Sequence, residues 1–382
     1  MRGYTSLPLL LAHASLRAAA LSLLLAARAS LALQPLTGRV AIVTGSSRGI
    51  GRGIAEELGA AGATVYCAAR STRDGFRSDD RAVGPEVGEL TVEAAAEAVD
   101  KAGGVGVACP CDCADADAVA ALVDRVQKEQ GRLDAVVASA FSTPPALDDA
   151  AFRDDFWKQG LEMWDACHGV GLRGAYALLL SAAPSLVETA EKTDARPLVV
   201  LVSSFGGQAY TFNVAYGVGK AATDRLAADA AVQLGKRGVD AVSLYPGVVA
   251  TEGNLEMDRR GDWEAASGGL DLSAGETPRF SGRAVAALLQ RPDYCKENSG
   301  SVQVVAELAA KFGFSDVDGR APPSIRSLRY LLPNFVLTDA KIETGFPEWL
   351  RPRVRAFRDD PPDVLLPWSV FSAGPPPEPD AG

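Results

Sequence analysis

The chain has 382 residues and a net charge of −10, and its 47% apolar and 23% charged residues are ordinary for a globular protein. This length allows one large α/β domain or two small domains with a sizeable core. The acidic balance argues against a nucleic-acid partner, because binding to phosphate backbones requires clustered Lys and Arg. With only two histidines, His13 and His168, a metal site built from several imidazoles is excluded.

The first 36 residues differ in composition from the rest and are expected to form a targeting leader. Arginines lie there among Leu, Ala and Ser, and the first acidic residue of the chain is Glu56. That composition is typical of a transit peptide for an organelle, either a mitochondrion or a plastid. The apolar run 18–27 leaves open a secretory or endoplasmic reticulum leader, or an uncleaved N-terminus, but it is shorter than the roughly 20 residues that span a bilayer.

From Arg39 onward, short apolar runs alternate with helical stretches, a pattern typical of an α/β doubly wound parallel sheet with helices on both faces. The run 198–202 contains no charged residue, which suits the middle of such a sheet. The expected strands span residues 40–43, 63–68, 105–108, 135–138, 198–202, 241–244 and, as the last strand, 301–305. The expected helices span residues 50–61, 91–102, 117–130, 161–180, 216–234 and, as the last helix, 284–289.

Polar segments rich in Gly or Pro interrupt this pattern in three places. Residues 71–88 are expected to form a surface loop, and the Gly- and charge-rich stretch from Glu252 to about Phe280 is a natural place for a mobile lid. The tail from Pro352 is proline-rich, and we expect disorder at its very end. The expected organisation is a leader (1–36), one α/β domain (37–320) and a C-terminal extension (321–382).

The six cysteines do not have the spacing of a small disulfide scaffold, which favours reduced thiols. Cys109, Cys111 and Cys113 alternate and would share one face of an extended segment. Zinc normally requires two separated pairs of ligands or added His, and no second group is visible. We therefore expect small buried thiols and no metal.

A glycine-rich turn, residues 44–51, joins the first expected strand to the first expected helix. Its glycines permit a tight turn and let backbone N–H groups approach a pyrophosphate, to which the helix N-terminus adds partial positive charge. The turn therefore predicts a dinucleotide cofactor. The residues expected to contact it are Gly45, Ser47, Arg48, Gly49, Ile50 and Gly51.

The residue that follows the second strand indicates which dinucleotide binds. An acidic side chain there would accept hydrogen bonds from the ribose hydroxyls, but this chain has Arg70, on which Arg48 can converge. Two guanidinium groups match a phosphate dianion better than a hydroxyl. NADP(H) is therefore preferred to NAD(H).

Tyr216 and Lys220 lie four residues apart at the start of a helix, so their side chains share one face. A phenol has a pKa of about 10, and lowering it to about 7 requires roughly 4 kcal/mol of preferential stabilisation of the phenolate. The lysine ammonium, together with the positive ring of an oxidised nicotinamide, could supply much of this. The pair therefore predicts a proton-transfer site.

Two further segments converge on that site. A strand ends in Ser203-Ser204, which brings a hydroxyl to the carboxyl edge of the sheet, where ligands of such folds bind. After the next strand, a Pro246-Gly247 turn can lay backbone against a nicotinamide, with Thr251 near its carboxamide or the pyrophosphate.

In these motifs and their order, the chain resembles the short-chain dehydrogenase/reductase family over residues 36 to 317, which implies a Rossmann-like fold. Within that family it is most similar to the branch called dehydrogenase/reductase member 1. The stretches that carry this second likeness are residues 156–157, 163–165, 170–174, 216–220 and 314–319.

The resemblance implies a role for each matching residue. Tyr216 would be the general acid in reduction, Lys220 would lower its pKa and bind the nicotinamide ribose, and Ser204, or its neighbour Ser203, would hold the substrate oxygen. The remaining implied cofactor contacts are Asp112 and the Cys113 backbone at the adenine, and Pro246, Gly247, Val249 and Thr251 near the nicotinamide.

The chain departs from the family pattern in two places. Residues 138–141 read Ala-Ser-Ala-Phe where the family usually has Asn-Asn-Ala-Gly, and Gly171 stands in place of the catalytic asparagine. His168, one helical turn before Gly171, could serve as a proton relay, although a structural histidine is the commoner case. The loss of the asparagine at Gly171 puts the usual relay of water and lysine in doubt.

The resulting hypothesis is a carbonyl reductase that transfers hydride between NADP(H) and a lipophilic ketone or secondary alcohol, of steroid-like or xenobiotic type. The substrate class is implied by the resemblance alone, as is a homodimer or homotetramer. The alternative is a catalytically silent NADP(H)-binding sensor or scaffold, which the lost asparagines favour. In the tail, Trp368 and Phe371 could contact a membrane or a partner subunit.

Overall fold

A computed structural model describes residues 35–75, 89–144 and 150–371. The predicted leader therefore lies outside the described residues, apart from its last two positions. Most of the predicted surface loop 71–88 and the end of the tail lie outside them too.

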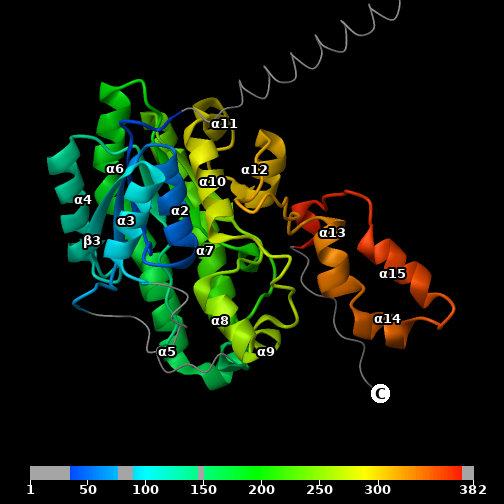
Figure 1. Cartoon of the computed structure of the whole chain (residues 1–382). Helices are drawn as coiled ribbons and strands as arrows, with labels where there is room; N and C mark the ends of the chain where they lie inside the picture. Colours follow the sequence, from blue (N-terminus) through cyan, green and yellow to red (C-terminus); the bar gives the residue numbers. More distant parts are fainter. Residues whose placement is uncertain (1–34, 76–88, 145–149, 372–382) are drawn as a thin grey trace, which may run out of the picture. The chain divides into compact units, whose positions relative to one another are not determined.

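Within the described ranges, seven strands form one parallel sheet in the order β3-β2-β1-β4-β5-β6-β7. Figure 1 shows the helices that lie over this sheet. Successive residues of β1 face opposite sides, and both faces are buried, which explains the unbroken apolar runs. The predicted α/β doubly wound sheet is confirmed. The strands are β1 (Val40–Thr44), β2 (Thr64–Ala69), β3 (Val105–Pro110), β4 (Ala135–Ala138), β5 (Leu198–Val202), β6 (Asp240–Tyr245) and β7 (Val302–Val304).

Helices cover both faces of the sheet and enclose two separate apolar cores. Ile54 and Phe280 belong to the core beneath α2, α3, α10 and α12, whereas Leu122 and Leu178 belong to the core beneath α4, α6 and α7. These helices are α2 (Gly49–Ala60), α3 (Val92–Ala102), α4 (Ala116–Gln130), α6 (Gly174–Lys192), α7 (Val214–Leu234), α10 (Pro278–Leu289) and α12 (Val305–Phe312).

The order of the strands also locates the ligand site. Strand β1 pairs with β2 on one side and β4 on the other, so the chain winds away from it in both directions. In open parallel sheets, ligands bind outside the carboxyl ends of the strands at such a reversal point. The glycine-rich turn follows β1 directly, as the sequence predicts.

The helical run Phe156–Lys192 is long and apolar enough to cross a membrane by composition alone. It is not a regular helix, because Gly160 has a φ of 69° and a π-helical turn, Gly169–Arg173, separates α5 (Phe156–His168) from α6. Leu178 and Leu186 of α6 are fully buried against the sheet. Helix α6 is therefore a core helix, whereas in α5 only Met163 and Cys167 are buried. The whole run is longer at both ends than the predicted 161–180.

The stretch expected to form a mobile lid contains two helices, α8 (Glu252–Arg260) and α9 (Trp263–Ser267). The prediction that 284–289 is the last helix is wrong. After α11 (Pro292–Glu297) and α12 come α13 (Leu328–Leu331), α14 (Asp339–Gly345) and α15 (Arg351–Asp359). These are short helices held by caps and ion pairs, such as the Arg351–Glu343 pair at 2.5 Å, and they leave no long apolar period in the sequence.

Candidate active site

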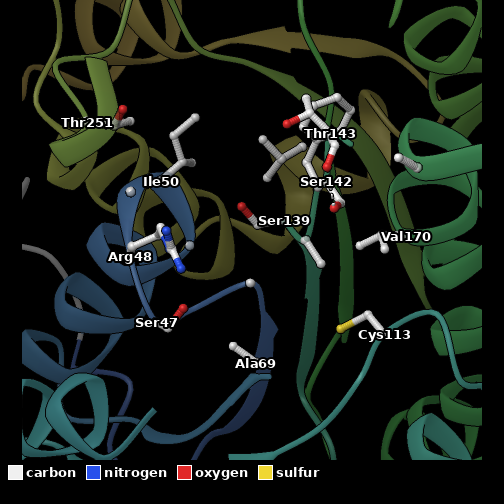
Figure 2. Close-up of a pocket in the computed structure, with 18 of the residues that line it drawn as sticks. Ser47, Arg48, Ile50, Ala69, Cys113, Ser139, Ser142, Thr143, Val170 and Thr251 are labelled. Atoms are coloured by element: carbon white, nitrogen blue, oxygen red, sulfur yellow. Dashed lines mark hydrogen bonds between the residues drawn. The ribbon is translucent and has the colours of Figure 1, made fainter. Parts of the chain in front are cut away.

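A cleft of about 1260 Å³ opens at the carboxyl ends of the strands (Figure 2). Most of the predicted site residues line it, whereas Asp112 and Val249 do not. The Asp112 carboxylate accepts a hydrogen bond from the Ala114 N–H at 3.0 Å, and the Val249 side chain is buried. The predicted residues that line the cleft are Gly45, Ser47, Arg48, Gly49, Ile50, Gly51, Arg70, Cys113, Ser204, Tyr216, Lys220, Pro246, Gly247 and Thr251.

The glycine-rich turn forms a cradle in which Gly45 and Gly51 cannot be replaced by residues with side chains without strain or a clash. Gly45 has a φ of +69°, and a Cβ at Gly51 would lie 2.3 Å from the Gly45 carbonyl oxygen. At the N-terminus of α2, the Gly49 N–H donates to the Glu252 carboxylate at 2.8 Å. The Glu252 carboxylate thus occupies the position at the helix N-terminus where an anion binds. The phosphates of a dinucleotide are anions that would suit the same position.

At the nucleotide end, Arg48 and Ser47 lie on the glycine-rich turn, and Figure 2 shows Ala69 from the end of β2 below them. Arg48 Nη2 donates to Ser71 Oγ at 3.4 Å, and Arg70 lines the same end of the cleft. Both arginines predicted to meet a phosphate therefore line the cleft.

The other end of the cleft holds the predicted proton-transfer pair. Asn213 caps α7 by accepting from the Tyr216 N–H at 2.8 Å, which fixes the first turn of that helix. The Tyr216 hydroxyl donates to Ser204 Oγ at 2.8 Å. Ser203 faces away, because its hydroxyl donates to the Lys220 carbonyl at 3.1 Å. Of the two serines left open by the sequence, Ser204 is the one that faces the tyrosine.

Lys220 lies at the bottom of the cleft, where its Nζ donates to the Val202 carbonyl at 3.1 Å. Desolvation lowers the pKa of Lys220 to about 8 and raises the pKa of Tyr216 to about 12. Among the protein's own groups, desolvation of the phenol outweighs the hydrogen bond with Ser204, which lowers the pKa of Tyr216. The predicted lowering also included the positive ring of an oxidised nicotinamide.

The two departures from the family pattern turn out to be complementary. A Cβ at Gly171 would lie 3.2 Å from Phe141 Cδ2, so the glycine leaves space for that ring. Phe141 packs edge-on against Tyr216 at 5.7 Å between ring centroids, with Phe152 and Phe212 at 6.0 and 5.4 Å. An aromatic enclosure therefore holds the tyrosine ring.

His168 does not fit the predicted role of proton relay. It is absent from the cleft lining, and its Nε2 lies 2.8 Å from the Ala215 carbonyl oxygen. The Trp164 ring packs against it at 3.8 Å between centroids, and a Cβ at Gly219 would meet the imidazole at 2.9 Å. The His168 side chain links α5 to α7 through its contact with the Ala215 carbonyl, so its role is structural.

A family model described as short chain dehydrogenase matches residues 39–260, which is more than half of the chain. The chain belongs to the short-chain dehydrogenase/reductase family. The predicted resemblance is thereby confirmed, and with it an NAD(P)-dependent oxidoreductase of the CH–OH/C=O type.

Named relatives and solved structures agree with this assignment. Dehydrogenase/reductase SDR family member 1 from Mus musculus is 38% identical over 303 residues, covering 78% of this chain and 89% of the relative. The 7alpha-hydroxysteroid dehydrogenase of Clostridium sardiniense is 28% identical, covering 59% and 76%. A putative dehydrogenase from Xanthomonas campestris has a TM-score of 0.58 at 24% identity, covering 75% and 94%, and this likeness shows the fold.

Glu252 occupies the anion position of this short-chain dehydrogenase/reductase, so its charge should oppose cofactor binding. We expect Glu252→Gln to tighten the binding of NADPH and of NADH by about 5-fold each, because a neutral amide is a weaker acceptor for Gly49 and does not repel the phosphates. Fluorescence titration measures both dissociation constants. The exposed Glu264→Gln on α9 is the control, and weaker binding by Glu252→Gln would contradict the expectation.

The residue that sequence reasoning missed is Glu276, which stands behind the Pro246-Gly247 turn. It is 2% exposed, and both of its carboxylate oxygens are buried. A Cβ at Gly247 would lie 2.8 Å from its Oε1, and its backbone pairs with Val248 and Ala250. Desolvation raises the pKa of Glu276 to about 8.

This pKa predicts a pH-dependent stability. The ordinary glutamate value is 4.5, so between about pH 4.5 and 8 the folded chain binds more protons than the unfolded chain. The contribution of Glu276 to the free energy of unfolding therefore falls as pH rises through this window. We expect Glu276→Gln to match the wild-type Tm at pH 4.5 and exceed it at pH 8.5, by thermal denaturation. The exposed Glu348→Gln should shift neither value, and a constant difference at both pH values would contradict the assignment.

Proposed function

We propose that this enzyme uses NADP(H) to interconvert a lipophilic ketone and its secondary alcohol, with Ser204, Tyr216 and Lys220 as catalytic residues. The observation that carries the proposal is the 2.8 Å hydrogen bond between the Tyr216 hydroxyl and Ser204 Oγ on the wall of the cleft. The cradle of the glycine-rich turn lies at the other end of the same cleft.

In reduction, the bound dinucleotide supplies the hydride. Ser204 Oγ holds the carbonyl oxygen of the substrate by donating a hydrogen bond to it. The Tyr216 hydroxyl gives its proton to that oxygen as negative charge develops there. The Lys220 Nζ, 5.6 Å from the centre of the tyrosine ring, stabilises the phenolate that remains. The Phe141 ring, 5.2 Å from the same Nζ, adds a cation–π contact that holds the ammonium in place.

The preference for NADP(H) is supported by Arg48 and Arg70 at the nucleotide end of the cleft. Guanidinium groups pair with a phosphate dianion through charge-assisted hydrogen bonds. For the substrate, Phe141, Pro144 and Val170 supply apolar lining beside the catalytic end. The name of the Clostridium sardiniense relative, a hydroxysteroid dehydrogenase, also supports a lipophilic, steroid-like substrate.

We further propose that the enzyme is a homodimer or homotetramer that reaches an organelle through its N-terminal leader. Support for self-association comes from apolar side chains on the outer faces of α6 and α7. Tyr176, Leu180 and Val232 are between 56% and 66% exposed there.

The experiment is an assay of the full chain with NADPH and NADH against a panel of aliphatic, steroid and quinone carbonyls, followed by absorbance. We expect turnover with NADPH to exceed turnover with NADH. In the Arg48→Gln/Arg70→Gln variant, kcat/KM for NADPH should fall by at least about 10-fold per arginine, while that for NADH stays unchanged. Binding of NADPH without turnover of any carbonyl would favour the silent sensor instead.

A further inference from the structure

In the sequence analysis, Trp368 and Phe371 are candidates for contact with a membrane or a partner subunit. In the structure they pack on the core of their own chain. They belong to the C-terminal strap, residues 362–371, which follows α15 and includes the short helix η7 (Trp368–Val370). This strap lies beyond the region matched by the family model, which ends at residue 260. The family model therefore says nothing about the contacts of the strap.

The strap is attached through backbone hydrogen bonds to the start of α13 and the residues just before it. The Leu328 N–H donates to the Val364 carbonyl at 3.0 Å, and the Leu366 N–H donates to the Arg326 carbonyl at 2.9 Å. The Arg326 side chain returns a bond to the Leu366 carbonyl at 3.0 Å and pairs with Glu307 at 2.5 Å. This backbone pairing and the ion pair fix where the strap crosses the core.

Arg326 also fixes Trp368, because its guanidinium lies 4.7 Å from the centre of the indole ring. The indole packs edge-on against Tyr245 at 5.7 Å between centroids, and Phe371 packs edge-on against Phe205 at 5.0 Å. Such aromatic pairs contribute packing beyond the area that they bury. The strap therefore contacts two rings of the core through two of its own.

Both core rings are chain neighbours of the active site. Phe205 directly follows Ser204, and Tyr245 directly precedes Pro246 at the end of β6. The two turns that close the catalytic end of the cleft are thus supported from behind by the same short segment. A displacement of the strap would be transmitted to the Ser204 hydroxyl and to the Pro-Gly turn.

Tyr245 extends this support to the catalytic helix. Its hydroxyl donates to the carboxylate of Asp224, which also accepts from Ser243 Oγ at 2.5 Å. Asp224 lies one turn after Lys220 on α7. The ring on which Trp368 packs is therefore hydrogen-bonded to the helix that carries Tyr216 and Lys220.

We propose that Trp368, whose indole lies 5.7 Å from the Tyr245 ring and 6.4 Å from the Phe205 ring, is a positioning residue. It holds these two rings so that Ser204 and the Pro246 turn keep the spacing that catalysis requires. The enzyme completes its active site with its own C-terminal extension. As far as it concerns turnover, this inference rests on the proposed function.

The test compares Trp368→Ala with Trp349→Ala in the full chain. Trp349 lies in the same extension and is 71% exposed, so it is a matched control. We expect Trp368→Ala to lower kcat for ketone reduction by about 10- to 100-fold, since small misplacements of catalytic groups have effects of this size. The KM for NADPH should stay within about 2-fold, because the contacts described for the strap are at Phe205, Tyr245 and residues 326–328. Trp368→Phe, which keeps a ring, should recover most of the kcat.

Hydrogen exchange separates this proposal from the proposed function. In Trp368→Ala, peptides that contain residues 203–208 and 244–248 should exchange faster, while Trp349→Ala should leave them unchanged. This measurement decides the proposal even if no carbonyl is turned over by the wild type, a result that would overturn the proposed function alone. Unchanged exchange and unchanged kcat in Trp368→Ala, or equal losses in both variants, would overturn the positioning role.

Discussion

Tyr216→Phe is expected to lower kcat for ketone reduction by about 10²- to 10⁴-fold, the usual contribution of a positioned general acid. The variant removes only the hydroxyl that lies 2.8 Å from Ser204 Oγ. The aromatic enclosure of Phe141, Phe152 and Phe212 still accepts a phenyl ring, so the packing is preserved. NADPH affinity should therefore stay within about 2-fold, because the phosphate cradle is untouched. Single-turnover absorbance and fluorescence titration measure the two quantities.

The control is Tyr210→Phe. Tyr210 is 64% exposed, and its hydroxyl donates to the Phe212 carbonyl at 3.2 Å, so this substitution also removes a hydrogen bond near the enclosure. It should change kcat by less than about 2-fold, as expected for a surface substitution. Turnover that survives Tyr216→Phe would show that the proton comes from another group.

The fold and the cofactor end could be predicted because each rests on local sequence. Strands buried on both faces must be apolar throughout, and a turn that brings backbone to a phosphate needs glycines at positions such as Gly45 and Gly51. The pair Tyr216 and Lys220 could be predicted for a similar reason, since four residues are one helical turn.

The details of the catalytic end depend on tertiary contacts that no local pattern contains. Ser203 and Ser204 are equivalent in sequence, and only the direction of the chain after β5 makes one face Tyr216 and the other the Lys220 carbonyl. The complementary pair Gly171 and Phe141 is separated by 30 positions, and each looked like a loss when considered alone. Glu276 was missed because its surroundings come from distant parts of the chain. Gly247 lies against its carboxylate, and Asp316 and Tyr330 are close enough to interact with it electrostatically.

The second large effect concerns the charge beside the phenol. We expect Lys220→Met to lower kcat/KM for alcohol oxidation by about 10²-fold or more near pH 8, because the phenolate of Tyr216 loses its cation. The pH profile should shift as well, with activity rising only at higher pH, where hydroxide can deprotonate an unassisted phenol. Lys220→Arg keeps a positive charge and should recover part of the rate. An unshifted profile in Lys220→Met would contradict an electrostatic role.

The same substitution should stabilise the fold, which separates catalysis from stability. The pKa of Lys220 is about 8 in the folded chain, against an ordinary value of 10.5. Between these values the unfolded chain binds more protons, so the wild-type free energy of unfolding rises with pH across that window. Lys220→Met should therefore have the higher Tm at pH 7, and its advantage should shrink as pH approaches 10.5. A Lys220→Met variant with a higher Tm and a lower kcat/KM than the wild type would show that the buried ammonium destabilises the fold but is needed for catalysis.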